Sequence, residues 1–552
     1  MARKYGIFLV IPTLVLAFTL LLKLATGPYW LAPNFDPSYQ YLINGLYLIK
    51  GFVPNHTDHP GTPLQMLCAA VSWIFNPGQS SVDIVKNVLT NPEYFLYIVF
   101  ILLSLFSFVT SLILAVYVFR KTKDWLAAVI TQCPTLLFLV LKSWETSQPV
   151  LPVVANVSPE PVLISVVNLF NLCLLMCFFA KSPQEETWAC LWMGFLGGLG
   201  VAVKLTFMPL LVIPLIFLSW KNKFIFIGTS VASFILWTLP IISKYPIIWG
   251  WINGIARQKS SGALSMEFLV GFIVVTAVIL VLKLVKRSAN KNAFFLLALA
   301  FGILLQFFVV LKHPGAHYLL PGLGLLGVLG FFIYWPLMAR SILGQRIVLV
   351  MIVAIALGAG WQTLNYYLRL KALTGQMLAF QQQVDSKYQN CIYIDYYRSS
   401  SPEGALFFGD GWNLSPQLGE ELSKIYPGRY YFNIWGNRIS NFNERVWSND
   451  LINQNSCVLF RGDGEFDFSP GPFTVKLLEK GRFENIYGLS QTTEKQGALF
   501  LAGSMQLFQS GDYAKALLYA LQARKFHYQP DTSIDSVINL LKPYVEHQLN
   551  PS

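Results

Sequence analysis

Charged residues are what this sequence has least of. Only 12% of its 552 residues are Asp, Glu, Lys or Arg, whereas 54% are hydrophobic. A soluble protein typically carries about 25% charged residues, so roughly half of the expected charge is missing. The composition therefore excludes an ordinary soluble globular protein.

Long apolar runs account for the missing charge. They cover residues 5–25, 94–119, 125–141, 161–180, 189–218, 224–242, 267–285, 293–311, 318–338 and 347–366. A bilayer core about 30 Å thick needs about 20 such residues per helix. Lys204 and Pro209 interrupt one run, which we interpret as two short spans that meet near Lys204. The sequence therefore predicts an α-helical polytopic membrane protein with about eleven transmembrane helices.

The first apolar run follows Arg3 and Lys4, as the apolar core of a signal peptide would. Its length exceeds that of a typical signal-peptide core, and the segment 23–28 offers only a weak cleavage site. We expect this run to be retained as the first helix.

The net charge of +12 is distributed over alternate loops rather than gathered into one basic surface. Lys and Arg concentrate in cytoplasmic loops, so this pattern places the N-terminus in the cytoplasm and residues from about 368 onward outside the membrane. We expect a multi-pass protein of the cell (inner or plasma) membrane, in contact with membrane lipids and not with nucleic acid. The basic positions are Arg3, Lys4, Arg120, Lys121, Lys123, Lys181, Lys221, Lys223, Lys283, Lys286, Arg287, Lys291, Arg340 and Arg346.

Cysteine is also scarce, with seven residues in the chain. Five lie in or beside apolar runs, where cysteine usually acts as a small apolar side chain. Cys391 and Cys457 fall in the expected exterior part, where a disulfide is allowed. The sequence does not show whether these two residues meet.

The character of the chain changes near residue 368, which gives three expected parts. Residues 1–367 form the transmembrane domain, with a first outer loop at 26–92. Residues 368–490 form an extracytoplasmic α/β domain, in which 391–397 and 405–409 are predicted strands and 416–425 is a predicted helix. Residues 491–552 form a helical cap, because 497–525 is typical of a helix, a turn and a second helix of tetratricopeptide-like repeat pattern.

The expected outer loops contain most of the polar residues that are suited to catalysis or ligand binding. The first loop supplies Asp36, His56, Asp58 and His59, and later loops supply Lys142, Glu145, Glu160, Lys204, Lys244, Arg257, Lys259, Lys312, His313 and His317. A carboxylate can act as general base toward a hydroxyl acceptor. Cations stabilise the negative charge that develops on a phosphate leaving group. Carboxylates early in the chain and cations in later loops therefore suit an anionic substrate carried on a lipid.

Each of these residues also has an ordinary structural interpretation. Asp36 precedes Pro37 and a helical stretch and suits an N-cap, whereas Asp58 suits a turn. His56, Asp58 and His59 are also candidate ligands of a divalent metal, so a metal is possible although no cofactor is certain. Among the cations, Lys204 suits a snorkelling lysine, Arg257 and Lys259 suit ordinary loop positions, and His313 suits a structural role beside Pro314.

At this point four motifs resemble the GT-C superfamily of polytopic glycosyltransferases, in particular the protein mannosyltransferases and lipid A aminoarabinose transferases that use polyprenyl-phosphate sugars. The motifs are Phe35-Asp36-Pro37-Ser38-Tyr39, Asp58-His59-Pro60-Gly61-Thr62-Pro63-Leu64, the glycine-rich run 194–206 with Lys204, and Lys312-His-Pro-Gly-Ala-His317-Tyr318-Leu-Leu-Pro321. Ser158-Pro159-Glu160-Pro161 adds to them, and the resemblance covers residues 1–366.

The resemblance implies inverting transfer of a sugar from a polyprenyl-phosphate donor to a lipid, glycan or protein acceptor at the extracytoplasmic face. Asp36 would be the general base, with Asp58 in support. The donor phosphate would be bound by Lys204, His317, Lys312, Arg257 and His59, and the other substrate contacts would come from Glu160, Tyr39 and Tyr318.

Two other functions fit the same residues. A transporter or flippase of a lipid-linked saccharide also needs a cationic cavity, although we find no internal repeat of the kind common in transporters. An O-antigen ligase or polymerase also joins lipid-linked sugars, but such proteins gather their polar residues in a large late loop. A membrane scaffold without catalytic activity is the remaining interpretation.

Overall fold

The computed structural model describes residues 6–31, 35–57, 60–141, 152–257, 291–312, 315–396, 401–411, 416–433, 438–443, 455–462, 473–481, 484–491, 494–526 and 532–549. The chain forms two compact units. One consists of Met1–Tyr29 and Pro33–Thr374, and the other of Trp30–Ala32 and Gly375–Ser552.

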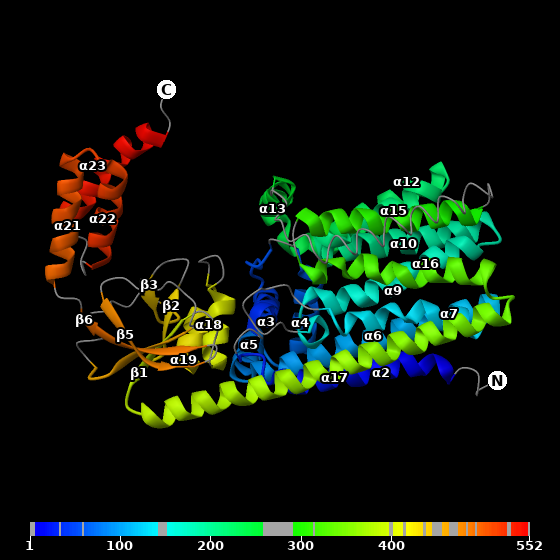
Figure 1. Cartoon of the computed structure of the whole chain (residues 1–552), viewed down its shortest axis with the longest axis horizontal. Helices are drawn as coiled ribbons and strands as arrows, with labels where there is room; N and C mark the ends of the chain where they lie inside the picture. Colours follow the sequence, from blue (N-terminus) through cyan, green and yellow to red (C-terminus); the bar gives the residue numbers. More distant parts are fainter. Residues whose placement is uncertain are drawn as a thin grey trace. The chain divides into compact units, whose positions relative to one another are not determined.

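The first unit is a bundle of helices, most of which run along a common direction (Figure 1). In chain order its elements are α2 (Ile7–Thr26), α3 (Phe35–Ile49), α4 (Thr62–Ile74), α5 (Ser81–Thr90), α6 (Pro92–Thr122), α7 (Trp125–Gln132), α8 (Pro134–Phe138), η2 (Val153–Ala155), α9 (Pro159–Phe179), α10 (Pro183–Val203), η3 (Leu205–Leu211), α11 (Val212–Phe217), α12 (Trp220–Thr238), η4 (Leu239–Lys244), α13 (Tyr245–Arg257), α15 (Lys291–Lys312), η5 (Ala316–Leu319), α16 (Leu320–Leu337) and α17 (Ile342–Lys387), the last of which continues into the second unit.

Seven helices in the described part of the chain are long and apolar enough to cross a membrane. They are Ile7–Thr26, Pro92–Thr122, Pro159–Phe179, Pro183–Val203, Trp220–Gly254, His317–Pro336 and Ile342–Lys387, and shorter apolar helices cover Thr62–Ile74, Trp125–Phe138, Leu205–Phe217 and Phe294–Val310. The prediction of a polytopic helical membrane protein is confirmed. The predicted span 267–285 lies outside the described residues, so the count of eleven stays a prediction.

Pro12 and Pro134 interrupt helices of the bundle, and one glutamine compensates for the hydrogen bond lost at Pro12. Pro134 divides the predicted span 125–141 into α7 and α8. Pro12 lies inside α2 and removes the helical partner of the Phe8 carbonyl. The Gln132 amide at the end of α7 donates to that carbonyl at 3.0 Å, and to the Ser111 carbonyl at 3.3 Å. The buried amide therefore links α2, α6 and α7.

The glycine-rich run in α10 allows this helix to approach α12 closely. A Cβ atom on Gly198 would lie 2.2 Å from the Ser230 carbonyl oxygen, and one on Gly194 would lie 1.9 Å from the Thr229 hydroxyl. Small residues that let two backbones approach are typical of helix pairs in membranes. The glycines of this motif therefore have a packing role as well as a place in the family resemblance.

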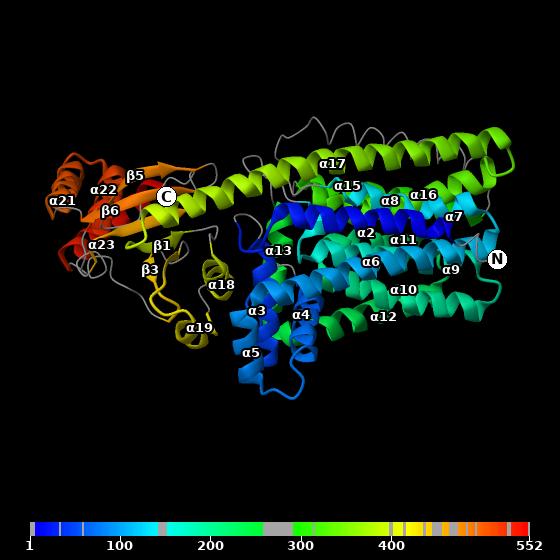
Figure 2. The ribbon, with the colours of Figure 1, turned by 90° about the horizontal axis from the view of Figure 1, so that it is seen from below.

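Short helices α3, α4 and α5 lie across the bundle at one of its ends (Figure 2). The α3–α4 pair is packed so closely that a Cβ on Gly45 would lie 2.8 Å from Cys68 Cβ. Ser80 caps α5, because its hydroxyl accepts the backbone N–H of Asp83. This end of the bundle therefore contains the acidic motif at the start of α3.

The second unit contains a mixed sheet, in the described residues of six strands ordered β3-β2-β1-β4-β6-β5. Strand β1 is parallel to β2 and β4, and the other neighbours are antiparallel. The strands are β1 (Ile392–Tyr396), β2 (Tyr430–Asn433), β3 (Arg438–Ser440), β4 (Val458–Gly462), β5 (Phe473–Lys480) and β6 (Asn485–Gln491). The expected α/β character of this region is confirmed.

One strand predicted in this unit is wrong. Residues 405–409 belong to helix α18 (Pro402–Asp410) instead. The Ser401 hydroxyl accepts the Gly404 N–H at 3.1 Å and Pro402 occupies the first turn, a common helix start that outweighs the short apolar run. The predicted helix at 416–425 is present as α19 (Gly419–Ile425), with a later start.

A disulfide joins Cys391 and Cys457, with their Cα atoms 4.7 Å apart. The two residues come immediately before the paired strands β1 and β4, and the Ile392 N–H donates to the Cys457 carbonyl at 3.0 Å. In the same sheet, Arg461 on β4 donates to Asp395 on β1 at 2.7 Å. Burial lowers the pKa of Arg461, but the Asp395 carboxylate raises it by more, so this guanidinium stays charged.

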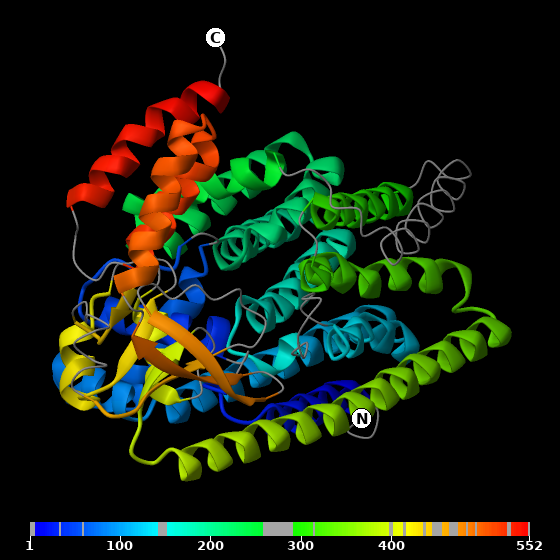
Figure 3. The ribbon, with the colours of Figure 1, turned by 60° about the vertical axis from the view of Figure 1, so that its left-hand side comes forward.

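The chain ends in three helices, α21 (Glu494–Gln509), α22 (Tyr513–Phe526) and α23 (Thr532–Leu549). They pack side by side, in orange to red in Figure 3, around Ala516, Ala520 and Ile538. The predicted helix, turn and helix over 497–525 is present, followed by the further helix expected at 531–548. The tetratricopeptide-like character of this region stays a prediction.

Candidate functional site

Three polar residues from separate motifs meet inside the first unit. The Lys204 ammonium contacts the Glu160 carboxylate, and it lies 4.8 Å from the centre of the Tyr318 ring. Lys204 and Glu160 are 6% and 5% exposed. The site therefore joins the start of α9, the end of α10 and η5, which are far apart in the sequence.

Local sequence explains how Glu160 and Lys204 are presented. Ser158 is extended and Pro159 begins α9, so Glu160 lies in the first helical turn, where a negative charge is favourable. Lys204 has φ −161 and ψ 133, an extended conformation that ends α10 and precedes the 3-10 turn η3. The backbone thus turns at the lysine and directs the chain away from the helix axis.

This ion pair is costly to bury and more costly to break. Removing one partner of a buried pair typically costs about 3–5 kcal/mol, because the other charge is left without compensation. Neither group can therefore be regarded as an isolated cation or anion. Lys204 and Glu160 act as one neutral unit unless a third charged group joins them.

His317 and Tyr318 of η5 are the remaining described residues of this site. Their ring centres are 3.9 Å apart, and His317 lies near enough to interact electrostatically with Glu160. The Gln306 amide of α15 donates to the Tyr318 carbonyl, which fixes η5 against α15. The imidazole adds a group that can carry positive charge beside the neutral Glu160–Lys204 pair.

The first outer loop is held in place by buried hydrogen bonds. The side-chain amide oxygen of Asn44 on α3 accepts the backbone N–H groups of Asn55 at 2.7 Å and His56 at 3.1 Å. The Gln65 amide on α4 donates to the His56 carbonyl at 2.8 Å, and the His56 ring meets the edge of Tyr41 at 5.3 Å. The chain just before Asp58 and His59 is therefore anchored between α3 and α4.

A hydrogen bond links the acidic motif to the motif that contains Glu160. The Val157 N–H donates to the Ser38 hydroxyl at 3.3 Å, and both residues are fully buried or nearly so. Ser38 follows Asp36 by two residues, and Val157 precedes Glu160 by three. The start of α3 and the start of α9 therefore lie side by side.

The other predicted site residues are described in part or not at all. Asp36 lies at the start of α3, Arg257 ends α13 and Lys312 ends α15, but their side chains lie outside the described residues. Asp58 and His59 lie outside the described residues altogether. Among the residues that are described, no group of three His, Cys, Asp or Glu side chains is placed to hold a metal.

A second polar cluster was missed by the sequence analysis. The Glu93 carboxylate at the start of α6 accepts the Tyr29 N–H at 2.8 Å and the Tyr39 hydroxyl at 2.9 Å. The Lys23 ammonium lies 3.2 Å from the centre of the Tyr29 ring. Burial and the nearby Tyr97 and Glu93 raise the pKa of the Tyr29 hydroxyl. A lysine inside the first apolar run was the available signal, because ionisable groups in such runs usually have a partner.

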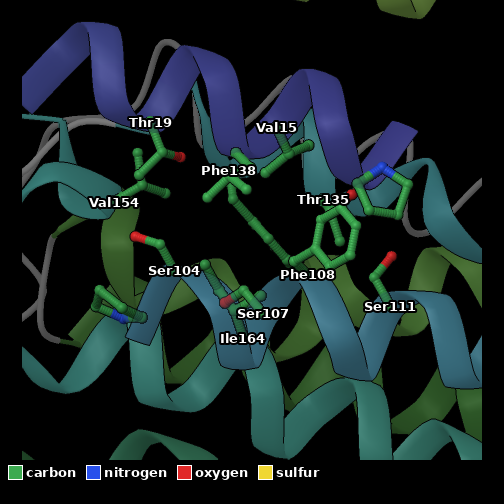
Figure 4. Close-up of a pocket in the computed structure, with 13 residues that line it drawn as sticks. Val15, Thr19, Ser104, Ser107, Phe108, Ser111, Thr135, Phe138, Val154 and Ile164 are labelled. Atoms are coloured by element: carbon green, nitrogen blue, oxygen red, sulfur yellow. The ribbon is translucent and has the colours of Figure 1, made fainter. Parts of the chain in front are cut away.

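A small pocket lies in the same unit, between α2, α6, α8 and α9 (Figure 4). Figure 4 shows Ser104, Ser107 and Phe108 of α6 facing Val15 and Thr19 of α2. The residues that line it carry no charge: Pro12, Val15, Leu16, Thr19, Ser104, Ser107, Phe108, Ser111, Thr135, Phe138, Val154, Pro161 and Ile164. Pro161 lines this pocket and directly follows Glu160 of the polar site in the sequence.

Fold and site together define a helical multi-pass membrane protein with a polar site at one end of its bundle and a C-terminal α/β region. The chain is similar to a solved structure, ArnT from Cupriavidus metallidurans bound to undecaprenyl phosphate, with 10% sequence identity, 86% of this chain and 97% of that chain covered, and a TM-score of 0.47. No family model and no curated protein matches the chain.

Proposed function

We propose that the chain is a membrane glycosyltransferase of GT-C type, which transfers a sugar from a polyprenyl-phosphate donor to a lipid, glycan or protein hydroxyl at the extracytoplasmic face. The observation that carries the proposal is the convergence of three of the motifs that resemble this superfamily. Glu160, Lys204 and Tyr318 meet, and the Ser38–Val157 hydrogen bond brings the acidic motif beside them.

In the proposed reaction, Asp36 accepts the proton of the acceptor hydroxyl, with Asp58 supporting the acceptor. The hydroxyl oxygen attacks the anomeric carbon and forms the new glycosidic bond. The bond from that carbon to the phosphate oxygen breaks, and its electron pair leaves with the polyprenyl phosphate. A direct displacement of this kind inverts the anomeric configuration.

The departing phosphate gains negative charge as the bond breaks, so cations near it lower the barrier. An ammonium has three donors, which makes the Glu160 contact of Lys204 compatible with a phosphate contact. We assign His317 the second phosphate contact, with Lys312, Arg257 and His59 from the surrounding segments. Tyr318 and Glu160 then border the sugar.

The second unit supports the proposed orientation. Disulfides persist in oxidising compartments and are rare in the cytosol. A disulfide between Cys391 and Cys457 thus agrees with an extracytoplasmic sheet, as does the distribution of basic loops. The proposal gives this unit a role in choosing or positioning the acceptor.

The decisive experiment follows product formation by purified protein in lipid nanodiscs, with a set of radiolabelled polyprenyl-phosphate sugars. Asp36→Asn should lower turnover by about 10²–10⁴-fold, the usual contribution of a general base, while the thermal unfolding temperature stays near that of the wild type. Near-normal turnover in this variant would remove Asp36 as the base.

The same assay separates an enzyme from a transporter or flippase of a lipid-linked saccharide. A transferase consumes the donor and releases free polyprenyl phosphate. It does so even in detergent, where no membrane separates two compartments. A transporter moves the intact donor across a sealed vesicle and makes no new glycosidic bond.

A further inference from the structure

The proposed reaction does not use a second group of buried contacts, which we call the Glu93 cluster. It consists of Glu93, Tyr29, Tyr39 and Lys23. One oxygen of the Glu93 carboxylate accepts the backbone N–H of Tyr29, and the other accepts the hydroxyl of Tyr39. These two donors flank the segment 30–38, which leads from α2 into the first turn of α3. A single carboxylate at the start of α6 therefore fastens both ends of the segment that contains Asp36.

Lys23 is the basic residue beside this carboxylate. It is 1% exposed, its ammonium donates to the Gly27 carbonyl at 2.9 Å, and it interacts electrostatically with Glu93. The rings of Tyr29 and Tyr97 lie 3.2 and 5.3 Å from the ammonium. Aromatic faces stabilise a cation that has lost its water. The cluster thus brings a buried lysine, two tyrosine rings and the Glu93 carboxylate together.

The position of Tyr39 connects the cluster to the proposed chemistry. Residues three apart on a helix lie on neighbouring positions of one face, so Tyr39 lies one turn after Asp36 on α3. The hydroxyl of Ser38, which lies between them in sequence, accepts the Val157 N–H. The first turn of α3 is therefore fixed to α6 through Tyr39 and to α9 through Ser38.

We propose that Glu93 is a positioning residue, which acts through Tyr39 to set the first turn of α3 and thereby the carboxylate of Asp36. This inference rests on the proposed function, in which Asp36 is the base. It assigns Tyr39, whose ring is 0% exposed and whose hydroxyl is engaged by Glu93, to positioning rather than to substrate contact.

The kinetic consequence is a loss in kcat with little change in KM for the donor. Displacing a catalytic group by about 1 Å can cost about 10²-fold in rate. Tyr39→Phe removes only the hydroxyl and should lower kcat about tenfold, within that range. The double variant Tyr39→Phe/Glu93→Gln should be little worse than Glu93→Gln alone, because both changes break the same contact.

Tyr334→Phe is a matched control. The Tyr334 hydroxyl of α16 donates to the Asp124 carboxylate at 3.0 Å, so this variant also deletes a tyrosine–carboxylate hydrogen bond inside the first unit. Asp124 caps α7, and neither residue belongs to the segments that form the polar site. We expect kcat of Tyr334→Phe to match the wild type.

A readout independent of activity tests the positioning itself. A cysteine is placed at the base position by Asp36→Cys, and its rate of reaction with a small maleimide is measured with and without Tyr39→Phe. If Glu93 and Tyr39 set this turn, the rate should change at least threefold, whereas adding Tyr334→Phe should leave it unchanged. An unchanged rate in the Tyr39→Phe background would overturn the inference, whatever happens to kcat.

The two proposals fail in different ways. If wild-type protein forms no glycosidic product from any donor, or if Asp36→Asn keeps its turnover, the proposed function fails while the maleimide rate still reports on the turn. If wild-type protein is active and Asp36→Asn is not, but Tyr39→Phe has wild-type kcat and an unchanged maleimide rate, only the role of Glu93 is excluded.

Discussion

At the scale of single residues, the structure shows that two charged side chains expected to act separately form a pair. From the sequence, Lys204 is expected to be one cation of a phosphate site and Glu160 a separate substrate contact. In the structure the two form a buried pair, with Tyr318 against the ammonium. Charge balance inside the bundle therefore depends on both residues. The pair has no net charge, so the positive charge that attracts an anionic substrate has to come from other residues around it.

This pairing makes a prediction about stability. Lys204→Met leaves Glu160 buried without its partner and should lower the free energy of unfolding by about 3–5 kcal/mol. The double variant Lys204→Met/Glu160→Leu should recover most of that loss, because no charge remains buried. Unfolding of the purified variants in detergent, followed by circular dichroism, checks both values.

An exposed ion pair provides the comparison for Lys204→Met. Lys424 and Glu420 form a pair on α19 whose side chains are 71% and 75% exposed. Exposed pairs of this kind contribute about 0.3–0.5 kcal/mol, so Lys424→Met should have little effect. Equal losses in the two lysine variants would show that the Glu160–Lys204 pair is not buried as described.

At the scale of elements, the first outer loop depends on a tight turn before α4. Gly61 has φ +67, a conformation that disfavours residues with a Cβ atom, and a Cβ there would lie 2.7 Å from the Tyr41 ring. Tyr41 in turn contacts the His56 ring. The turn, the ring and the loop that precedes Asp58 therefore form one packed group.

Substitutions at two glycines measure the effects of backbone strain and of steric contact separately. Gly51 has φ +74 but open space around its Cβ position. Gly51→Ala should cost about 1–2 kcal/mol, the penalty of the left-handed backbone alone, and should keep transfer activity. Gly61→Ala carries the same backbone penalty and also displaces Tyr41, so it should unfold at a lower temperature than Gly51→Ala and lose activity. The same unfolding temperature and activity in both variants would contradict this packing.

At the scale of the whole molecule, the disulfide and the topology make linked predictions. Denatured protein should expose five thiols before reduction and seven afterwards, because Cys391 and Cys457 are joined. Cys391→Ser should destabilise the sheet by about 2–4 kcal/mol, the usual effect of losing a disulfide. Thiol counting by mass spectrometry and denaturant titration test the two statements separately.

The predicted orientation is tested by labelling from one side of a sealed membrane. Cysteines are introduced in the second unit by Lys424→Cys, and in the predicted cytoplasmic turn between α16 and α17 by Arg340→Cys, both at exposed positions. An impermeant maleimide added to right-side-out vesicles should label the first and not the second. Labelling in the reverse order would place the second unit in the cytoplasm and exclude the proposed extracytoplasmic reaction.

Much of this protein is determined by the sequence alone, because the signals are local or compositional. Apolar runs of sufficient length predict membrane helices wherever they occur. The change near residue 368 predicts a second kind of fold, in which strand β1 and helix α19 are confirmed. Residues 405–409 form a helix instead, because Ser401 caps it, and strands β2 to β6 were not predicted. The four motifs mark the candidate residues but do not show which of them touch.

Only the tertiary structure decides the partners. The Glu160–Lys204 pair joins residues 44 positions apart, Val157 meets Ser38 across 119 positions, and Tyr39 meets Glu93 across 54. No periodicity or spacing rule encodes such contacts, because they depend on how helices pack through sites such as Gly198 and on where prolines bend them. The sequence therefore specified the kinds of charge that the membrane unit contains, and the fold specified which charges are paired, which are buried and which segment Glu93 fastens.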